Sequence, residues 1–159
     1  MIHHVSIPAH DPRQVAEVLA ELMEGRAYPF SGPLPGAYMA VSGDPHGTMI
    51  EVYQEDVTLL PGDGDLQVVF NRGASAYQSG PVHILLSVPR SKDEIQAIGD
   101  RVGWRTRYFG RGRPGQPAVF HLFELWVENR FMVEVAPCGV ASEYEKFMQF
   151  ETLDALFAR

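Results

Sequence analysis

The sequence predicts an α+β fold in which two βαβββ modules form a curved, eight-stranded cup with outer helices, followed by a C-terminal helix. The main observation is an internal repeat. The string that opens at His4 returns at His83, 79 residues later, and the string around Glu51 returns at Glu134, 83 residues later. Two separations of nearly the same length indicate a repeated structural unit. The second observation is size: a unit of ~55 residues buries too little apolar surface to be stable alone, so we expect the two modules to pack together.

The first module is expected over residues 1–54. Its opening stretch, 2–9, alternates and contains β-branched residues, which predicts a strand. Asp11 then provides an N-cap, and apolar residues at helical spacing predict an amphipathic helix over 12–24 that Gly25 ends. Three further short strands are expected at about 26–30, 37–42 and 48–54.

The second module is expected over residues 81–137, with the same order of elements. A strand at 82–88 is followed by Ser91 and Glu94, which have the spacing of a capping box at the start of a helix. Gly103 is the predicted end of that helix. The remaining strands are expected at about 104–109, 118–127 and 130–136.

Two segments lie outside the repeat. Residues 55–80 are rich in Gly, Asp, Ser and Asn and are interpreted as a connector, with one short strand possible at 66–70. Residues 138–159 form a C-terminal extension, in which Ser142 is the expected N-cap of a helix. The helix carries an apolar stripe that needs a surface to cover, which predicts a homodimer or packing on its own chain: Phe147, Phe150, Leu153, Leu156 and Phe157.

Composition narrows the possible partners. The formal net charge is −7 and the pI is near 5.3, which argues against nucleic acid and against anionic membrane surfaces. The single cysteine, Cys138, excludes an intrachain disulfide framework, and no apolar run approaches the ~20 residues that cross a bilayer. We therefore expect a cytoplasmic protein. The one basic cluster could contact an anionic substrate or simply be solvated: Arg105, Arg107, Arg111 and Arg113.

The repeated histidines and glutamates are the candidate site. Alternation along a strand puts His4 on the face opposite the helix, and it puts Glu51 and Glu134 on faces opposite their apolar neighbours. A glutamate in so apolar a strand needs water, a cation or a metal. Each residue taken alone could be a packed or solvated side chain. As a repeated pair they predict that His4, Glu51, His83 and Glu134 bind one divalent metal ion, for which Zn, Ni, Mn, Co and Fe(II) are all suitable.

These strings resemble the signatures of the vicinal oxygen chelate superfamily, which includes glyoxalase I, methylmalonyl-CoA epimerase, extradiol dioxygenases, and fosfomycin and bleomycin resistance proteins. The segments that carry the resemblance are 4–11, 44–51, 83–88 and 132–135, so it covers about 1–136. The sequence departs from the family pattern where Glu128-Asn129-Arg130 replaces the usual turn before the second glutamate.

The resemblance implies an enzyme that acts on a small molecule. A carboxylate in both modules is similar to the glyoxalase I and epimerase arrangement, in which a metal acts as a Lewis acid on two vicinal oxygens and stabilises an enediolate. In that lyase or isomerase reaction Glu134 would be the permanent ligand, and Glu51 would leave the metal and act as the base. An extradiol-type dioxygenase with three protein ligands, and a resistance-type protein that binds a small molecule without metal, are the alternatives.

Overall fold

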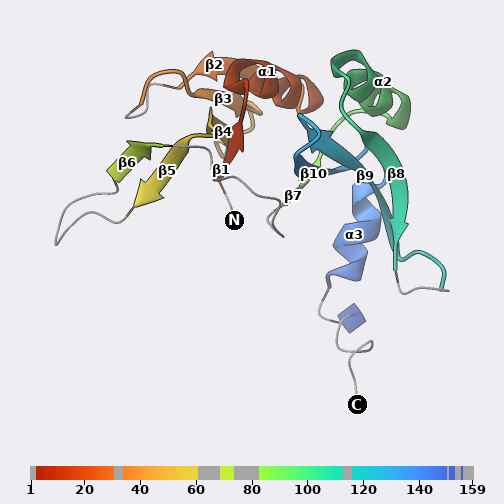
Figure 1. Ribbon diagram of the computed structural model, residues 1–159. Coiled ribbons are helices and arrows are strands. Elements are labelled where there is room, and N and C mark those ends of the chain that lie inside the picture. Colours follow the sequence, from red (N-terminus) through yellow and green to blue (C-terminus); the bar gives the residue numbers. More distant parts are fainter. Residues whose placement is uncertain are drawn as a thin grey trace. The chain divides into compact units, whose positions relative to one another are not determined.

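The computed structural model describes residues 3–30, 34–60, 69–73, 83–112, 116–149, 151–152 and 155. The chain divides into two compact units, Met1–Gly80 and Pro81–Arg159. Figure 1 shows that each unit contains a mixed sheet with a long helix against it. The predicted α+β class and the two βαβββ modules are confirmed. The arrangement of both sheets as one cup stays a prediction.

The first unit has the predicted βαβββ order. Its four strands form one sheet in the order β1-β4-β3-β2, in which β1 and β4 are parallel and the other neighbours are antiparallel. The elements are β1 (His4–Ala9), α1 (Pro12–Leu22), β2 (Arg26–Pro29), β3 (Tyr38–Val41) and β4 (Met49–Gln54). α1 follows β1 and leads into β2, and the parallel neighbours β1 and β4 carry His4 and Glu51.

Local chemistry explains where α1 begins and how closely it approaches the sheet. The Asp11 side chain accepts a hydrogen bond from the Gln14 backbone N–H at 3.0 Å, as an N-cap does. Leu19 and Leu22 are fully buried in the core of the unit. After the helix, Gly25 lies against the backbone of β3, and a Cβ at this position would overlap the carbonyl oxygen of Val41. A residue without a side chain is therefore required where the chain leaves the helix.

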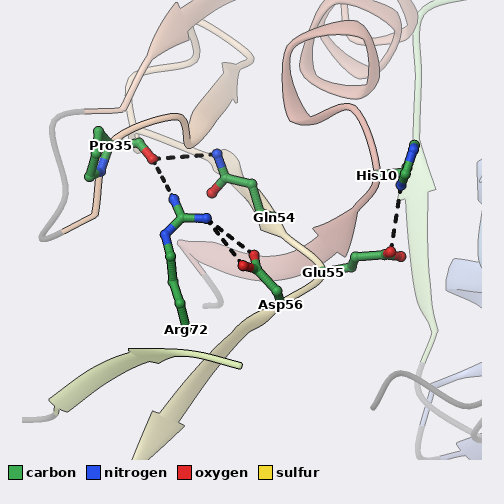
Figure 2. A network of polar contacts seen from close by, with 6 residues as sticks. All are labelled: His10, Pro35, Gln54, Glu55, Asp56 and Arg72. Atoms are coloured by element: carbon green, nitrogen blue, oxygen red, sulfur yellow. Dashed lines mark hydrogen bonds and ion pairs between the residues drawn. The ribbon is translucent and has the colours of Figure 1, made fainter. Parts of the chain in front are cut away.

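The connector contains a hairpin that the sequence predicts only in part. β5 (Val57–Leu60) pairs antiparallel with β6 (Val69–Arg72). The sequence indicates one possible strand at 66–70, of which residues 66–68 lie outside the described residues. Figure 2 shows Arg72 between the Asp56 carboxylate and the Pro35 carbonyl oxygen, to which it donates at 3.2 Å and 2.8 Å. Arg72 thus fastens the hairpin to the loop that precedes β3.

The second unit repeats the same topology. Its strand order is β7-β10-β9-β8, again with one parallel pair, β7 and β10, and antiparallel neighbours elsewhere. The elements are β7 (Ile84–Ser87), α2 (Lys92–Val102), β8 (Thr106–Arg111), β9 (Phe120–Val127) and β10 (Phe131–Ala136). The repeat seen in the sequence is therefore a repeat of topology and of strand pairing.

Two predicted signals of α2 are confirmed. Ser91 and Glu94 form a reciprocal capping box, and Gly103 ends the helix with a left-handed φ of 70°. Inside the helix, Gly99 lies against Thr106 of β8, and a Cβ at Gly99 would overlap the Thr106 hydroxyl. The helix thus reaches the sheet through a glycine, as the first unit does at Gly25.

The turn between β9 and β10 differs from the family pattern but keeps the register. Glu128 and Asn129 both have positive φ, 51° and 57°, a conformation that Asn tolerates better than most residues. The Asn129 side chain accepts from the Arg105 N–H at 2.7 Å and donates to the Gly103 carbonyl at 3.1 Å. Asn129 therefore fixes the hairpin to the loop between α2 and β8.

The C-terminal helix is present, but its predicted start is wrong. α3 (Ala141–Phe147) begins one residue before Ser142, and its N-cap is Val140, without a side-chain cap. Packing explains the shift, because the Phe147 and Tyr144 rings lie 5.6 Å and 5.2 Å from the ring of Phe120 on β9. The other four residues of the predicted stripe lie outside the described residues, and the homodimer stays a prediction. Among the described residues, no helix has the length and apolar character needed to span a membrane.

Candidate functional site

The parallel strand pairs place the two glutamates at equivalent positions. In the first unit Glu51 of β4 lies opposite Ser6 of β1, and in the second unit Glu134 of β10 lies opposite Leu85 of β7. On β1, His4 lies two residues before Ser6 and therefore on the same strand face as Ser6. His83 lies two residues before Leu85, immediately before β7 begins. Within each unit, the histidine and the glutamate thus belong to neighbouring segments of the parallel strand pair.

Exposure on β1 follows the predicted alternation. His4 and Ser6 are exposed, whereas Ile7 and Ala9 are buried, at 2% and 1% exposure. The face that carries His4 is therefore not the face that packs into the core beneath α1. His4 has the accessibility that a ligand or substrate contact requires.

Glu51 has neutral hydrogen-bonding neighbours. The residue is 8% exposed, and its Oε2 accepts a hydrogen bond of 2.8 Å from the Ser6 hydroxyl. Among the described residues, no Arg, Lys or His forms an ion pair with Glu51. A buried carboxylate without a counter-ion attracts cations, because the surrounding protein screens its charge poorly.

Tyr53, two residues along β4, completes these surroundings. Burial, with the nearby Glu51 charge and a hydrogen bond to Glu51, raises the pKa of Tyr53 to about 12. Its ring lies between Phe30 and Phe70, with centroid distances of 5.9 Å and 5.7 Å. The Tyr53 hydroxyl therefore stays protonated beside Glu51, and the β5–β6 hairpin supplies part of the aromatic wall.

Glu134 has a cationic partner instead. Arg111 donates to its Oε1 from Nη2 at 2.8 Å and from Nε at 3.2 Å. The other oxygen, Oε2, lies 3.8 Å from the Nε2 atom of His83. One oxygen of Glu134 is thus held by the guanidinium, and the other faces the predicted histidine ligand.

A second glutamate shares the same arginine. Arg111 Nη2 also donates to Glu124 Oε1 at 2.9 Å, and Glu124 lies directly opposite Glu134 in the β9–β10 pair. Burial disfavours the charged form of Arg111, but the hydrogen bonds and charges of the two glutamates outweigh it and raise the pKa of Arg111. Two carboxylates opposite each other would repel, so the arginine between them stabilises the sheet.

Glu124 is not among the residues predicted from the sequence, and Arg111 is predicted only as part of a general basic cluster. The signal that could have found them is the strand pairing. Once β9 and β10 are joined by a short turn, Glu124 falls opposite Glu134, and two like charges at opposed positions require a cation nearby. Arg111 at the end of β8 is long enough to supply it.

The donor atoms of the second unit fit half of a metal site. Ligand atoms that share an ion at ~2.0–2.2 Å lie about 3 Å apart, and the His83–Glu134 separation of 3.8 Å is close to that value. The His83 side chain is 43% exposed, which leaves room for the small rotation required. Among the described residues, no group of three or more His, Cys, Asp or Glu side chains is arranged to hold a metal. The predicted four-residue set takes two residues from each unit and stays a prediction.

This chain resembles known proteins in its three-dimensional structure. No protein-family profile and no curated sequence matches it. The fosfomycin resistance protein FosX from Mesorhizobium loti has a TM-score of 0.51 at 13% identity, covering 91% of this chain and 96% of that one. A glyoxalase/bleomycin resistance protein/dioxygenase from Alicyclobacillus acidocaldarius, at 14% identity and 90% and 95% coverage, has a TM-score of 0.43. Together with the two repeated βαβββ modules, the FosX match shows that the chain has the vicinal oxygen chelate fold.

Proposed function

We propose that this protein is a metal-dependent lyase or isomerase that moves a proton on a small substrate with two adjacent oxygens. The observation that carries the proposal is the contrast between two equivalent glutamates. Glu51 is 8% exposed and forms no ion pair with any Arg, Lys or His among the described residues, whereas Glu134 is held by Arg111. Two carboxylates in different surroundings can take different roles in acid–base chemistry.

Glu51 is the base in this proposal. Its hydrogen-bond donors in the described part of the chain are the hydroxyls of Ser6 and Tyr53, so no guanidinium there occupies the oxygens that would take the proton. Glu51 takes the proton from the hydroxyl-bearing carbon of the substrate and returns it to the neighbouring carbonyl carbon. It therefore ends the cycle unprotonated. Tyr53 and Ser6 keep the carboxylate oriented by donating hydrogen bonds.

His4, His83 and Glu134 are the proposed permanent ligands, and Glu51 is the ligand that can leave. A bound divalent ion would supply Lewis-acid stabilisation of the negative charge that develops on the substrate oxygen. Arg111 occupies Oε1 of Glu134 with two hydrogen bonds, so this oxygen is not open to a substrate proton. This agrees with a ligand role for Glu134.

One observation favours a second candidate, a small-molecule-binding protein that needs no metal. Arg111 already neutralises part of the Glu124–Glu134 charge, so the second unit has a satisfied polar face without any ion. In that protein the aromatic wall around Tyr53 would bind the ligand. The extradiol-type dioxygenase is the third outcome that the experiments separate.

The test measures metal and proton transfer separately. Purified protein is titrated with Zn²⁺, Ni²⁺, Mn²⁺ and Co²⁺ by calorimetry. Each loaded form is then incubated in D₂O with hydroxyacetone, or with the hemithioacetal of a 2-oxoaldehyde and a thiol, and loss of the carbon-bound proton is followed by NMR. Wild-type protein is expected to bind one ion per chain and to catalyse exchange.

Substitutions at the two glutamates should then have different effects. Glu51→Gln is expected to keep the metal and to slow exchange by roughly 10²–10⁴-fold, the usual worth of a positioned base. Glu134→Gln should weaken metal binding by roughly 10²–10³-fold. This is the loss expected if one of four ligands contributes about a quarter of a binding free energy of ~10–16 kcal/mol. Full exchange activity in Glu51→Gln would contradict the base assignment. Binding of one metal ion by the wild-type protein without any proton exchange would favour the dioxygenase. Tight ligand binding without any metal would favour the second candidate.

A further inference from the structure

The inference concerns Arg111, and it rests on the proposed metal site. We propose that Arg111 is a positioning residue: it holds Oε1 of Glu134 so that only Oε2 is presented beside His83. Glu134 then binds the ion through one oxygen. Nothing in the proton-transfer role of Glu51 requires this, and the motifs that led to the four predicted ligands do not include Arg111.

The contacts show how the side chain is held. Both Nε and Nη2 of Arg111 donate to the same oxygen of Glu134, at 3.2 Å and 2.8 Å. Nη2 donates in addition to Glu124 at 2.9 Å. The guanidinium is planar and its nitrogens are fixed relative to one another, so three contacts determine its position and, through it, the rotation of the Glu134 carboxylate.

The direction in which Oε2 of Glu134 points follows from these contacts. With Oε1 held, the carboxylate plane leaves Oε2 on the side of His83, 3.8 Å from Nε2. The Glu134 side chain is only 13% exposed, so few other positions are open to it. Partners that orient a ligating carboxylate commonly change metal affinity by ~10–100-fold when they are removed.

Glu124 has a supporting role. It lies opposite Glu134 and anchors the far side of the guanidinium. Without this second anchor, Arg111 could rotate and offer its nitrogens to both oxygens of Glu134. A bidentate Arg–carboxylate pair of that kind would block the oxygen that the ion needs.

The experiment separates geometry from charge. Arg111→Lys keeps the positive charge but loses the two-nitrogen contact with Oε1, whereas Arg107→Lys makes the same exchange at another arginine of β8 as a matched control. Co²⁺ and Zn²⁺ affinities are measured by calorimetry, and the visible absorption of bound Co²⁺ reports the number and type of ligands. Circular dichroism and thermal melting check that both variants fold.

We expect Arg111→Lys to bind Co²⁺ about 10–100-fold more weakly, with a changed Co²⁺ spectrum, and Arg107→Lys to match the wild type. Glu124→Gln, which keeps the charge of Arg111, should change the Co²⁺ spectrum in the same sense as Arg111→Lys. An unchanged affinity and spectrum in Arg111→Lys would overturn the positioning role and leave the metal site intact. Failure of the wild-type protein to bind Co²⁺ or Zn²⁺ would overturn both this inference and the proposed function.

Discussion

The two modules have the same strand order and the same pairing register, but they surround their glutamates with different chemical groups. Glu51 receives a hydrogen bond from Ser6, and Glu134 receives two from Arg111. The positions that face the glutamates explain the difference. Ser6 is replaced by Leu85 in the second module, and a leucine cannot donate a hydrogen bond.

The lengths of the edge strands contribute as well. β2 in the first module has four residues and stops at Pro29, whereas β8 in the second has six and ends at Arg111. The extra length carries the arginine to the glutamates. The comparison teaches that a duplicated scaffold can keep two carboxylates in register while one or two neighbouring positions give them different chemistry.

The largest expected effect tests how each helix approaches its sheet. Gly25→Ala should destabilise the protein by about 3 kcal/mol or more, because the new Cβ would overlap the backbone of Val41, which no side-chain rotation can relieve. Gly99→Ala should cost about 1–2 kcal/mol, since the overlap involves the Thr106 side chain and alanine favours the helix. Urea unfolding of both variants measures the difference.

A rescue variant sharpens this test. Thr106→Ala removes the atom nearest to the added methyl group, so the double variant Gly99→Ala/Thr106→Ala should recover part of the loss. No such partner exists on the Val41 backbone. Equal costs for the two glycine variants, without rescue, would contradict the contrast between a backbone and a side-chain contact.

The next effect is a loss of stability at alkaline pH, which we expect from Tyr53 in the first module. The pKa of Tyr53 is raised to about 12, whereas a tyrosine of the unfolded chain ionises near ~10. The contribution of the neutral hydroxyl is fully present below pH ~10 and is lost as the pH rises towards 12. It amounts to about 1–3 kcal/mol. Ala136 occupies the equivalent position in the second module, two residues after Glu134.

Urea unfolding at pH 8.5 and pH 11.5 measures this loss. Tyr53→Phe should be less sensitive to the change of pH than the wild type, because it has no proton to lose at that position. Glu51→Gln should reduce the sensitivity in part, since it removes the charge that helps to raise the pKa. The same pH dependence in Tyr53→Phe and wild type would show that Tyr53 does not produce it.

The last test concerns the turn of the second module. Asn129→Ala should cost about 2 kcal/mol, because alanine loses two side-chain hydrogen bonds and tolerates a φ of 57° poorly. Asn129→Gly should cost about 1 kcal/mol, since glycine accepts the backbone conformation and loses only the hydrogen bonds. Thermal melting ranks the two variants. An equal loss would mean that the backbone conformation contributes nothing.

The repeat and the local signals made the modules predictable. Alternation, the Asp11 N-cap, the Ser91–Glu94 capping box and the Gly103 stop act over a few residues, and the structure contains each of them. Ser142 was misassigned because the start of a short helix depends on packing against Phe120 more than on its cap. Half of the β5–β6 hairpin was missed because its pairing joins segments whose composition indicates a loop.

The sequence by itself determined the α+β modules, their repeat and the equivalent positions of the histidines and glutamates, because strand alternation and helix caps depend on near neighbours. Only the tertiary structure decided which groups surround each glutamate. Arg111 is 23 residues from Glu134, Glu124 reaches it from the adjacent strand, and Tyr53 is enclosed by Phe30 and Phe70 from distant segments. These contacts depend on strand order and side-chain reach, and they determine which groups donate hydrogen bonds to each carboxylate.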